Sequence, residues 1–219
     1  MPTSRLEPNK QLTRAARDIL EPAGLLQRGR SRTWLDDSGW WLCVVEFQPS
    51  SWSKGSYLNV GCCWLWIVKD YFSFDEGDRV EPFVEFQDTS QFEKAARELS
   101  TRALSEVQRY RALFPRPSAV ARYYSNHQPA GYAWAFHAGV AAGLAGDAKG
   151  ARKFFNHFRS VTDDREFVLR QNEDAAHLSN LVGNAREFRA EVAERVHAAR
   201  KSLKLTEWRE LDFDDARSA

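Results

Sequence analysis

Apolar and polar positions in the first part of the chain change from a helical to a strand-like spacing. In residues 9–21 apolar side chains recur three or four positions apart, which predicts a helix that ends before Gly24. Beyond Gly24 the spacing becomes two, and clusters of turn-forming residues interrupt it, which predicts short strands. The predicted strands run from Leu25 to the turn at Asp36, from Trp40 to Gln48, from Tyr57 to Lys69 and from Glu81 to Phe86. Consecutive strands with short links indicate an antiparallel meander of about four strands.

After residue 88 the apolar spacing becomes helical. The predicted helices cover residues 90–114, 118–127, the two arms of a hairpin over 131–162, and 166–205. Ser90 and Glu93 have the spacing of a capping box, in which each side chain satisfies a free backbone amide at a helix start. Gly146 and Asp147 predict the hairpin turn, because glycine adopts the left-handed conformation and aspartate caps the next helix. Gly183 predicts a kink or break in the long last helix.

These elements predict an α+β fold with an N-terminal helix, about four antiparallel strands, and a helical C-terminal half packed on one face of the sheet. Two regions are expected, an α+β sheet module over residues 1–115 and a helical extension over residues 116–219. We expect both to share one core, because the helix that begins at Ser90 follows directly from the last strand. A chain of 219 residues is long enough to bury such a core.

Charge is nearly balanced over the whole chain but unevenly placed along it. A net charge of +1, with 43% hydrophobic and 28% charged residues, is typical of globular proteins and argues against binding of nucleic acid or membrane by the protein as a whole. Residues 69–88 hold seven acidic residues against two basic ones. By contrast, Arg28, Arg30 and Arg32 occupy alternate positions with no acid between them, which predicts a basic strand face.

The chain carries no signature of a secreted or membrane protein. Its first residues, Met1–Arg5, lack an apolar leader, and the longest apolar run, Val60–Val68, is about half as long as a membrane helix requires. The three cysteines, Cys43, Cys62 and Cys63, lie in predicted strands and form no C-x-x-C motif, which indicates reduced, buried thiols. We therefore expect a cytoplasmic protein without membrane association.

Motifs for catalysis or metal binding do not stand out in the sequence. No G-x-S-x-G, phosphate-binding glycine loop or H-E-x-x-H occurs, and no histidine has another three or four positions away. We therefore predict no metal, no cofactor and no catalytic residue. A hydrolase or nuclease with an unrecognised site is the alternative, and its candidate acids and bases are Asp36, Asp37, Glu46 and His127.

Polar side chains interrupt the apolar strands on either side of residues 49–55. In one interpretation Gln48 and Asn59 bridge neighbouring strands and fix their register, because buried amides require hydrogen-bond partners. In the other they belong to a recognition surface with nearby Trp, Tyr and Arg residues, the types most enriched in binding hot spots. The candidate binding residues are Arg28, Arg30, Gln48, Ser50, Trp52, Tyr57 and Asn59.

The same region resembles a bacterial family of unknown function. The resemblance lies within residues 9–90, in the motifs Gly24-Leu25, Arg28-Gly29-Arg30, Val45-Glu46-Phe47-Gln48-Pro49-Ser50 and Tyr57-Leu58-Asn59-Val60-Gly61. They match a basic-glycine element, a strand ending in Val-x-Phe-Gln-x-Ser and an aromatic-rich strand with Asn-x-Gly. Pro49 stands where the family pattern has a basic residue. The resemblance implies a compact α+β module with a meander, and it implies no established activity.

The leading hypothesis is a non-enzymatic protein-binding module, of the kind that serves as an immunity or regulatory partner in bacterial conflict or defence. Besides the hydrolase or nuclease, a second alternative is a nucleic-acid-binding module that uses the predicted strand face of Arg28, Arg30 and Arg32. Self-association through the apolar stripe of the helix over 166–205 is a further expectation for the partners of this chain.

Overall fold

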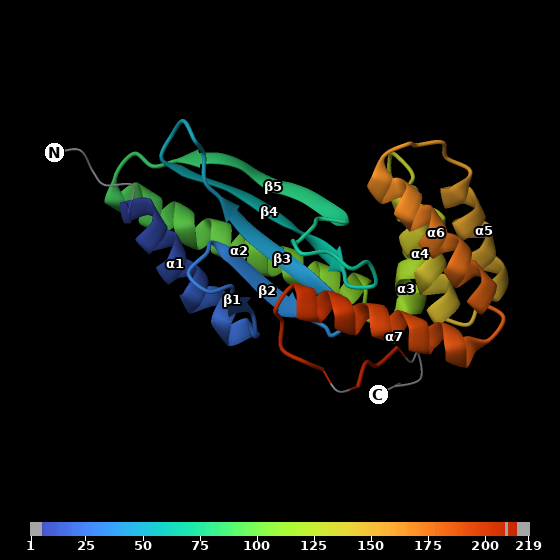
Figure 1. The fold of residues 1–219 in the computed structure, drawn as a ribbon. Helices are drawn as coiled ribbons and strands as arrows, with labels where there is room; N and C mark the ends of the chain where they lie inside the picture. The colour runs from blue at the N-terminus through green and yellow to red at the C-terminus, as the bar shows by residue number, and fades with distance from the viewer. Residues whose placement is uncertain (1–5, 209, 214–219) are drawn as a thin grey trace. The chain divides into compact units, whose positions relative to one another are not determined.

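The computed structural model describes residues 6–208 and 210–213, and its elements divide into two compact units (Figure 1). The sheet unit comprises the chain up to Cys63 together with Phe72–Ala112. The helical unit comprises Trp64–Tyr71 together with the chain from Leu113 onward. The chain therefore passes between the units three times. The segment Met1–Arg5, for which the sequence predicts no leader, lies outside the described residues, and one core common to both units stays a prediction.

The sheet unit is built on a five-stranded antiparallel meander, which confirms the predicted α+β class and is close to the predicted strand number. The strands follow in chain order: β1 Leu26–Gln27, β2 Thr33–Asp37, β3 Trp41–Gln48, β4 Gly55–Trp64 and β5 Glu76–Glu85. The extra strand arises because the first predicted strand is a hairpin. Gly29 has a φ of +57°, a left-handed conformation that turns the chain between β1 and β2.

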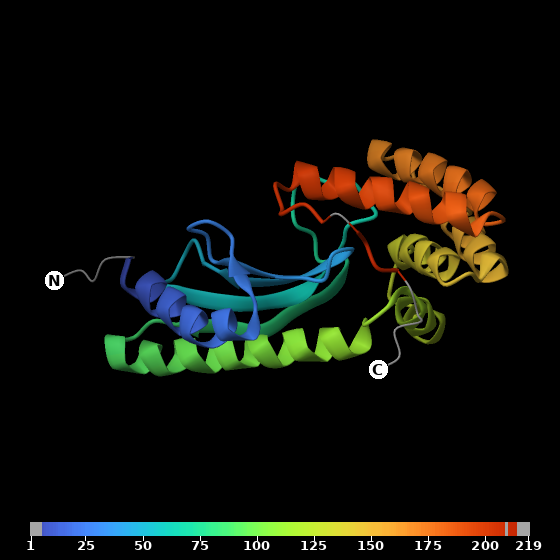
Figure 2. The same cartoon turned by 90° about the horizontal axis from the view of Figure 1, so that it is seen from below.

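Two helices, α1 (Leu6–Leu20) and α2 (Thr89–Leu113), lie side by side on one face of the sheet (Figure 2). A short 3₁₀ turn, η1 (Glu21–Ala23), follows α1. The predicted capping box of Ser90 and Glu93 is wrong. The Asp88 carboxylate accepts the backbone N–H of Gln91 at 2.9 Å, so the cap is Asp88 and Ser90 lies inside the first turn.

The helix-facing side of the sheet contributes to the core of this unit. Cys43, Val45 and Phe47 of β3 are almost fully buried. The expectation for the cysteines is confirmed, since all three lie in strands and are free and buried. Burial raises the pKa of the Cys43 and Cys62 thiols, because the low-dielectric interior disfavours the thiolate. Both cysteines therefore act as small apolar side chains.

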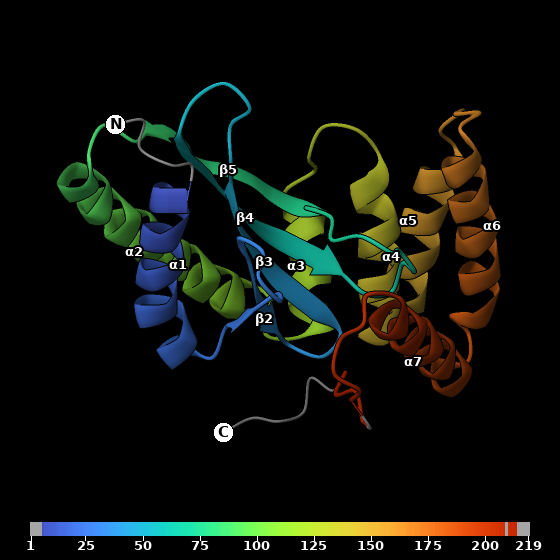
Figure 3. The same cartoon turned by 60° about the vertical axis from the view of Figure 1, so that its left-hand side comes forward.

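The helical unit contains α3 (Pro117–Asn126), α4 (Ala133–Leu144), α5 (Ala148–Arg159), α6 (Glu166–Leu181) and α7 (Ala185–Ser202) (Figure 3). The predicted hairpin is α4 and α5. Gly146 has a φ of +83°, and the Asp147 carboxylate accepts the Gly150 N–H at 2.8 Å. The helices approach closely at Gly139, where a Cβ atom would lie 2.7 Å from the Phe155 ring.

The predicted helix over 166–205 is two helices, and the predicted break at Gly183 is confirmed, because the chain turns at residues 182–184. The Asn184 side chain accepts the backbone N–H of Glu187 at 3.3 Å and so begins α7 as a separate helix. Helix α6 begins at Glu166, as predicted, and three residues before it lies Asp163. Its carboxylate accepts the N–H and guanidinium of Arg165, the residue that precedes α6. Self-association through this region stays a prediction.

The predicted strand Tyr57–Lys69 is too long, because β4 ends at Trp64 and the chain then enters the helical unit. Trp64 and Trp66 are fully buried and stack with ring centroids 5.1 Å apart. The Trp64 indole donates to the Tyr124 hydroxyl at 3.2 Å, and the Trp66 indole donates to Nδ1 of His137 at 3.0 Å. Both buried indole donors are therefore satisfied within the helical unit.

Within the described part of the chain, no helix combines the length and the apolar character needed to cross a membrane.

Replacing His137 by leucine should destabilise the helical unit by about 1–3 kcal/mol, because the buried Trp66 N–H loses its acceptor. His137→Asn is the matched control, since its side-chain oxygen can stand near the position of Nδ1. Urea unfolding followed by tryptophan fluorescence measures both free energies of unfolding. A loss of equal size in the two variants would contradict a role for this hydrogen bond.

Candidate functional site

The structure sorts the predicted binding residues into two groups within the sheet unit. Gln48, Tyr57 and Asn59 lie together on one face of the sheet. Ser50 and Trp52 lie in the loop of residues 49–54 between β3 and β4, which we call the display loop. Arg28 and Arg30 lie in the turn between β1 and β2.

The first group forms a hydrogen-bonded array that we call the sheet-face cluster, made of Glu46, Gln48, Tyr57, Asn59 and Arg79. Asn59 Nδ2 lies 2.9 Å from Glu46 Oε2 and 3.0 Å from Gln48 Oε1. Arg79 Nη2 donates to the same Gln48 oxygen at 3.1 Å. The Arg79 guanidinium also lies over the Tyr57 ring, 4.0 Å from its centroid. Three neighbouring strands are thus joined by one set of side chains.

The sheet-face cluster lies on the face of the sheet opposite to α1 and α2. Successive strand residues point to opposite faces, and Phe47 and Leu58, which adjoin cluster residues in sequence, are buried. The cluster residues themselves are partly or fully exposed to solvent. The pairing of β4 with β5 shifts register between Leu58 and Asn59, so Arg79 lies opposite Asn59. The cluster therefore fixes the strands where their pairing is irregular.

The display loop is held in shape by hydrogen bonds at its base and near its tip. Arg32 Nη1 donates to the carbonyl oxygens of Phe47 at 3.4 Å and Gly55 at 3.3 Å, the residues that flank the loop. The Ser50 hydroxyl accepts the backbone N–H of Trp52 at 3.1 Å. The Trp52 side chain itself is 95% exposed. The loop thus presents an indole ring to solvent on an ordered backbone.

The predicted basic strand face is wrong, because residues 28–32 form a turn instead of a strand. Its three arginines have different surroundings. Arg28 lies over the Phe72 ring at 5.8 Å, and Arg32 is half-buried against the display loop, where burial lowers its pKa. Arg30 alone of the three is exposed. Charge on this turn is therefore presented to solvent mainly by Arg30.

Within the sheet unit, the acids of the hydrolase alternative are not brought to one site. Asp36 faces α2, where its carboxylate accepts two hydrogen bonds from Arg111, at 2.6 and 2.9 Å. Glu46 lies on the opposite face of the sheet. Asp37 accepts the Gly39 N–H at 2.9 Å and so shapes the turn between β2 and β3. His127 belongs to the helical unit, where its ring stacks on Tyr123.

Among residues 6–208 and 210–213, no three histidine, cysteine, aspartate or glutamate side chains gather as a metal site requires.

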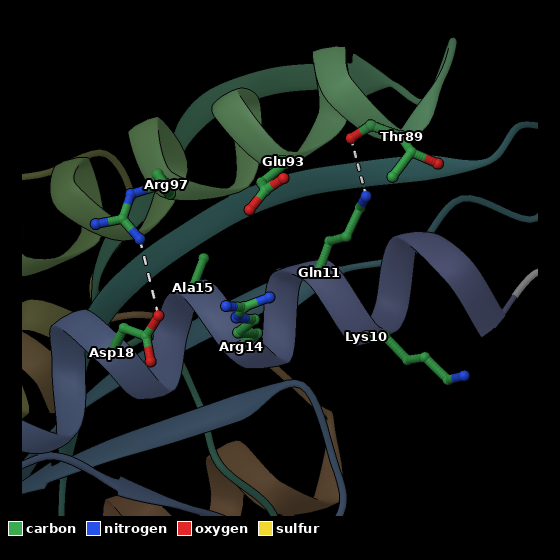
Figure 4. A pocket seen from close by; sticks show the side chains of 8 residues that line it. All are labelled: Lys10, Gln11, Arg14, Ala15, Asp18, Thr89, Glu93 and Arg97. Atoms are coloured by element: carbon green, nitrogen blue, oxygen red, sulfur yellow. Dashed lines mark hydrogen bonds and ion pairs between the residues drawn. The ribbon is translucent and has the colours of Figure 1, made fainter.

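A groove of about 260 Å³ runs between α1 and α2 (Figure 4). Its lining residues are Lys10, Gln11, Arg14, Ala15, Asp18, Thr89, Glu93 and Arg97. Gln11 donates to the Thr89 carbonyl at 2.9 Å and Arg97 pairs with Asp18 at 3.7 Å, so the polar groups link the helices, whereas Lys10 points away from α2. The groove is smaller than pockets that hold drug-sized ligands, roughly 300–1,000 Å³, and lacks their apolar lining.

Sequence reasoning missed Arg32 and Arg79 as partners of the candidate residues. The sequence predicts a strand only from Glu81 and so leaves Arg79 outside it, whereas in the structure Arg79 lies in the first half of β5. The spacing of two between Arg79 and Glu81 was the available signal that Arg79 belongs to the same strand as Glu81. Arg32 was assigned to the basic face with Arg28 and Arg30, and Gly29 was the signal for a turn there.

No protein-family model matches the chain, and the searches of curated proteins and of solved structures also give no match. The resemblance to a bacterial family of unknown function thus stays a prediction.

Replacing Asn59 by alanine should lower the free energy of unfolding by about 1 kcal/mol, because hydrogen bonds to Glu46 and Gln48 are lost at a half-exposed site. Glu46→Gln is the control, since it keeps an oxygen acceptor. Urea titration of the whole chain provides the measurement. Unchanged stability of the Asn59→Ala variant would show that the cluster does not hold the strands together.

Removing the guanidinium of Arg32 should loosen the display loop, because the Phe47 and Gly55 carbonyls lose their shared donor. We expect Arg32→Gln to speed trypsin cleavage after Lys54 in limited proteolysis under native conditions. Arg30→Gln removes a neighbouring charge on the same turn and serves as the control. Equal cleavage rates after Lys54 in both variants would contradict a role for the Arg32 hydrogen bonds in holding the loop.

Proposed function

We propose that this protein is a non-enzymatic protein-binding module that engages its partner through the display loop, with Trp52 as the central contact. The observation that carries the proposal is the 95% exposure of Trp52 on a loop that Arg32 and Ser50 hold in shape. A role as an immunity or regulatory partner in bacterial conflict or defence is the setting in which we place this module.

The exposure of Trp52 leaves a large free energy unused in the isolated chain. A tryptophan side chain buries about 150–250 Å² when covered, which corresponds to a gross gain of about 4–6 kcal/mol. Tryptophan is also among the residues most enriched in binding hot spots. A loop that is already ordered loses little conformational entropy on binding, which preserves more of that gain.

The edge strand of the sheet is less suited to contact a partner than the display loop. β5 is the edge strand beyond β4, and an exposed edge can receive a strand from a partner. Pro82 removes a backbone donor from β5, and charged residues such as Asp78 and Glu81 lie along it. These features discourage strand addition, as natural edge strands commonly do.

Capture of partner proteins from a lysate of the native host tests the proposal. The immobilised full chain should retain a stoichiometric protein that Trp52→Ser retains at about thirtyfold lower affinity or worse, the loss expected of a hot-spot tryptophan. The substitution should leave the free energy of unfolding within about 0.5 kcal/mol, because the residue is a surface one.

Tyr71→Ser is the matched control, because Tyr71 is another exposed aromatic residue, at 61%, outside the display loop. Capture that is equal for the wild-type chain and Trp52→Ser, or that Tyr71→Ser reduces as much, would refute the display loop as the contact.

A further inference from the structure

Basic residues lie on one side of the display loop, at the end of the sheet that carries Trp52. The β1–β2 turn reaches the same end, because the Phe47 N–H donates to the Arg32 carbonyl at 3.1 Å. No aspartate or glutamate occurs in residues 22–35 or 47–69. Within those two stretches the turn contributes Arg28, Arg30 and Arg32, and the loop contributes Lys54. In a chain with a net charge of +1 this is a strong local excess.

Negative charge borders this region on one side. Glu85 lies opposite Gly55 in the β4–β5 pairing, and the Phe86 N–H donates to the Lys54 carbonyl at 2.8 Å. Glu85 and Asp88 are both exposed. The end of the sheet thus has a basic side at the β1–β2 turn and an acidic side after β5, with the display loop between them.

We propose that the partner of the display loop is a protein whose contact segment is acidic and carries an apolar side chain, so that its carboxylates face Arg30 while the apolar group covers Trp52. This inference rests on the proposed function and specifies the chemistry of its partner. Charge of opposite sign raises the rate of encounter and fixes the orientation of a partner. Like charge at Glu85 excludes the reverse orientation.

The bipolar arrangement favours a protein over a single-stranded nucleic acid. A nucleic acid carries a negative phosphate at every nucleotide and would extend onto Glu85 and Asp88. Of the three arginines on the turn, Arg28 lies against Phe72 and Arg32 against backbone carbonyls, which leaves Arg30 to meet phosphate. A short acidic peptide segment places its charge on one side only, as this surface requires.

Selection from a displayed library of random linear peptides tests the inference on the full chain, with oligothymidylate as the nucleic-acid probe. Peptides enriched on the wild-type chain but not on Trp52→Ser should be rich in Asp and Glu and contain an aromatic or large aliphatic residue. The enriched peptides, synthesised and measured by fluorescence anisotropy, should bind Arg30→Gln about two- to fivefold more weakly, as expected for a partly exposed charge pair. Glu85→Gln is the matched control and should bind them at least as tightly as the wild-type chain.

The results distinguish failure of the acidic-partner inference alone from failure of the display loop as a protein contact. Enriched peptides that depend on Trp52 but lack acidic residues, or that bind Arg30→Gln as tightly as the wild-type chain, overturn the acidic-partner inference and leave the proposed function standing. Absence of any Trp52-dependent peptide counts against both. Oligothymidylate binding that Trp52→Ser abolishes and that falls steeply with salt overturns both in favour of a nucleic-acid ligand.

Discussion

The two-residue alternation of β3 and β4 is the constraint on which the arrangement of the sheet unit depends. It sends Phe47 and Leu58 to one face, where they are buried, and Glu46 and Asn59 to the other, where they bond each other. A shift of register by one residue would exchange the two sets and bury a carboxylate without a partner. The buried face and the sheet-face cluster therefore specify the same register independently.

That register also decides what lies at the ends of the strands. Because Thr33 pairs with Glu46, the β1–β2 turn must lie beside the start of the display loop, and Arg32 can reach the carbonyls that flank it. The shape of the loop that presents Trp52 thus depends on the pairing of β2 with β3. The sheet-face cluster and the display loop differ in this respect. The polar groups of the cluster bond one another, whereas the Trp52 indole is exposed to solvent.

Spacing alone predicted the α+β class, the meander and the α4–α5 hairpin, because each depends on a local period or on a turn residue such as Gly146. It placed Gln48 and Asn59 in one neighbourhood for the same reason. It missed Arg79, because a charged, half-exposed edge strand has no apolar alternation to distinguish it from a loop. It predicted one helix interrupted at Gly183, because the apolar stripe continues beyond the turn at which Asn184 caps α7.

The tryptophans show why a site is harder to predict than a fold. Trp64 and Trp66 sit in an apolar run, and their indole N–H groups find the acceptors Tyr124 and His137 inside the helical unit. Trp52 has serine on both sides, and its indole can hydrogen-bond to water without such acceptors. The sequence neighbours of each ring correlate with its exposure. The acceptors of the two buried indoles, however, lie 60 and 71 residues away in the chain. A buried indole requires a distant acceptor that only the tertiary fold supplies, whereas an exposed indole requires only a loop that presents it to solvent.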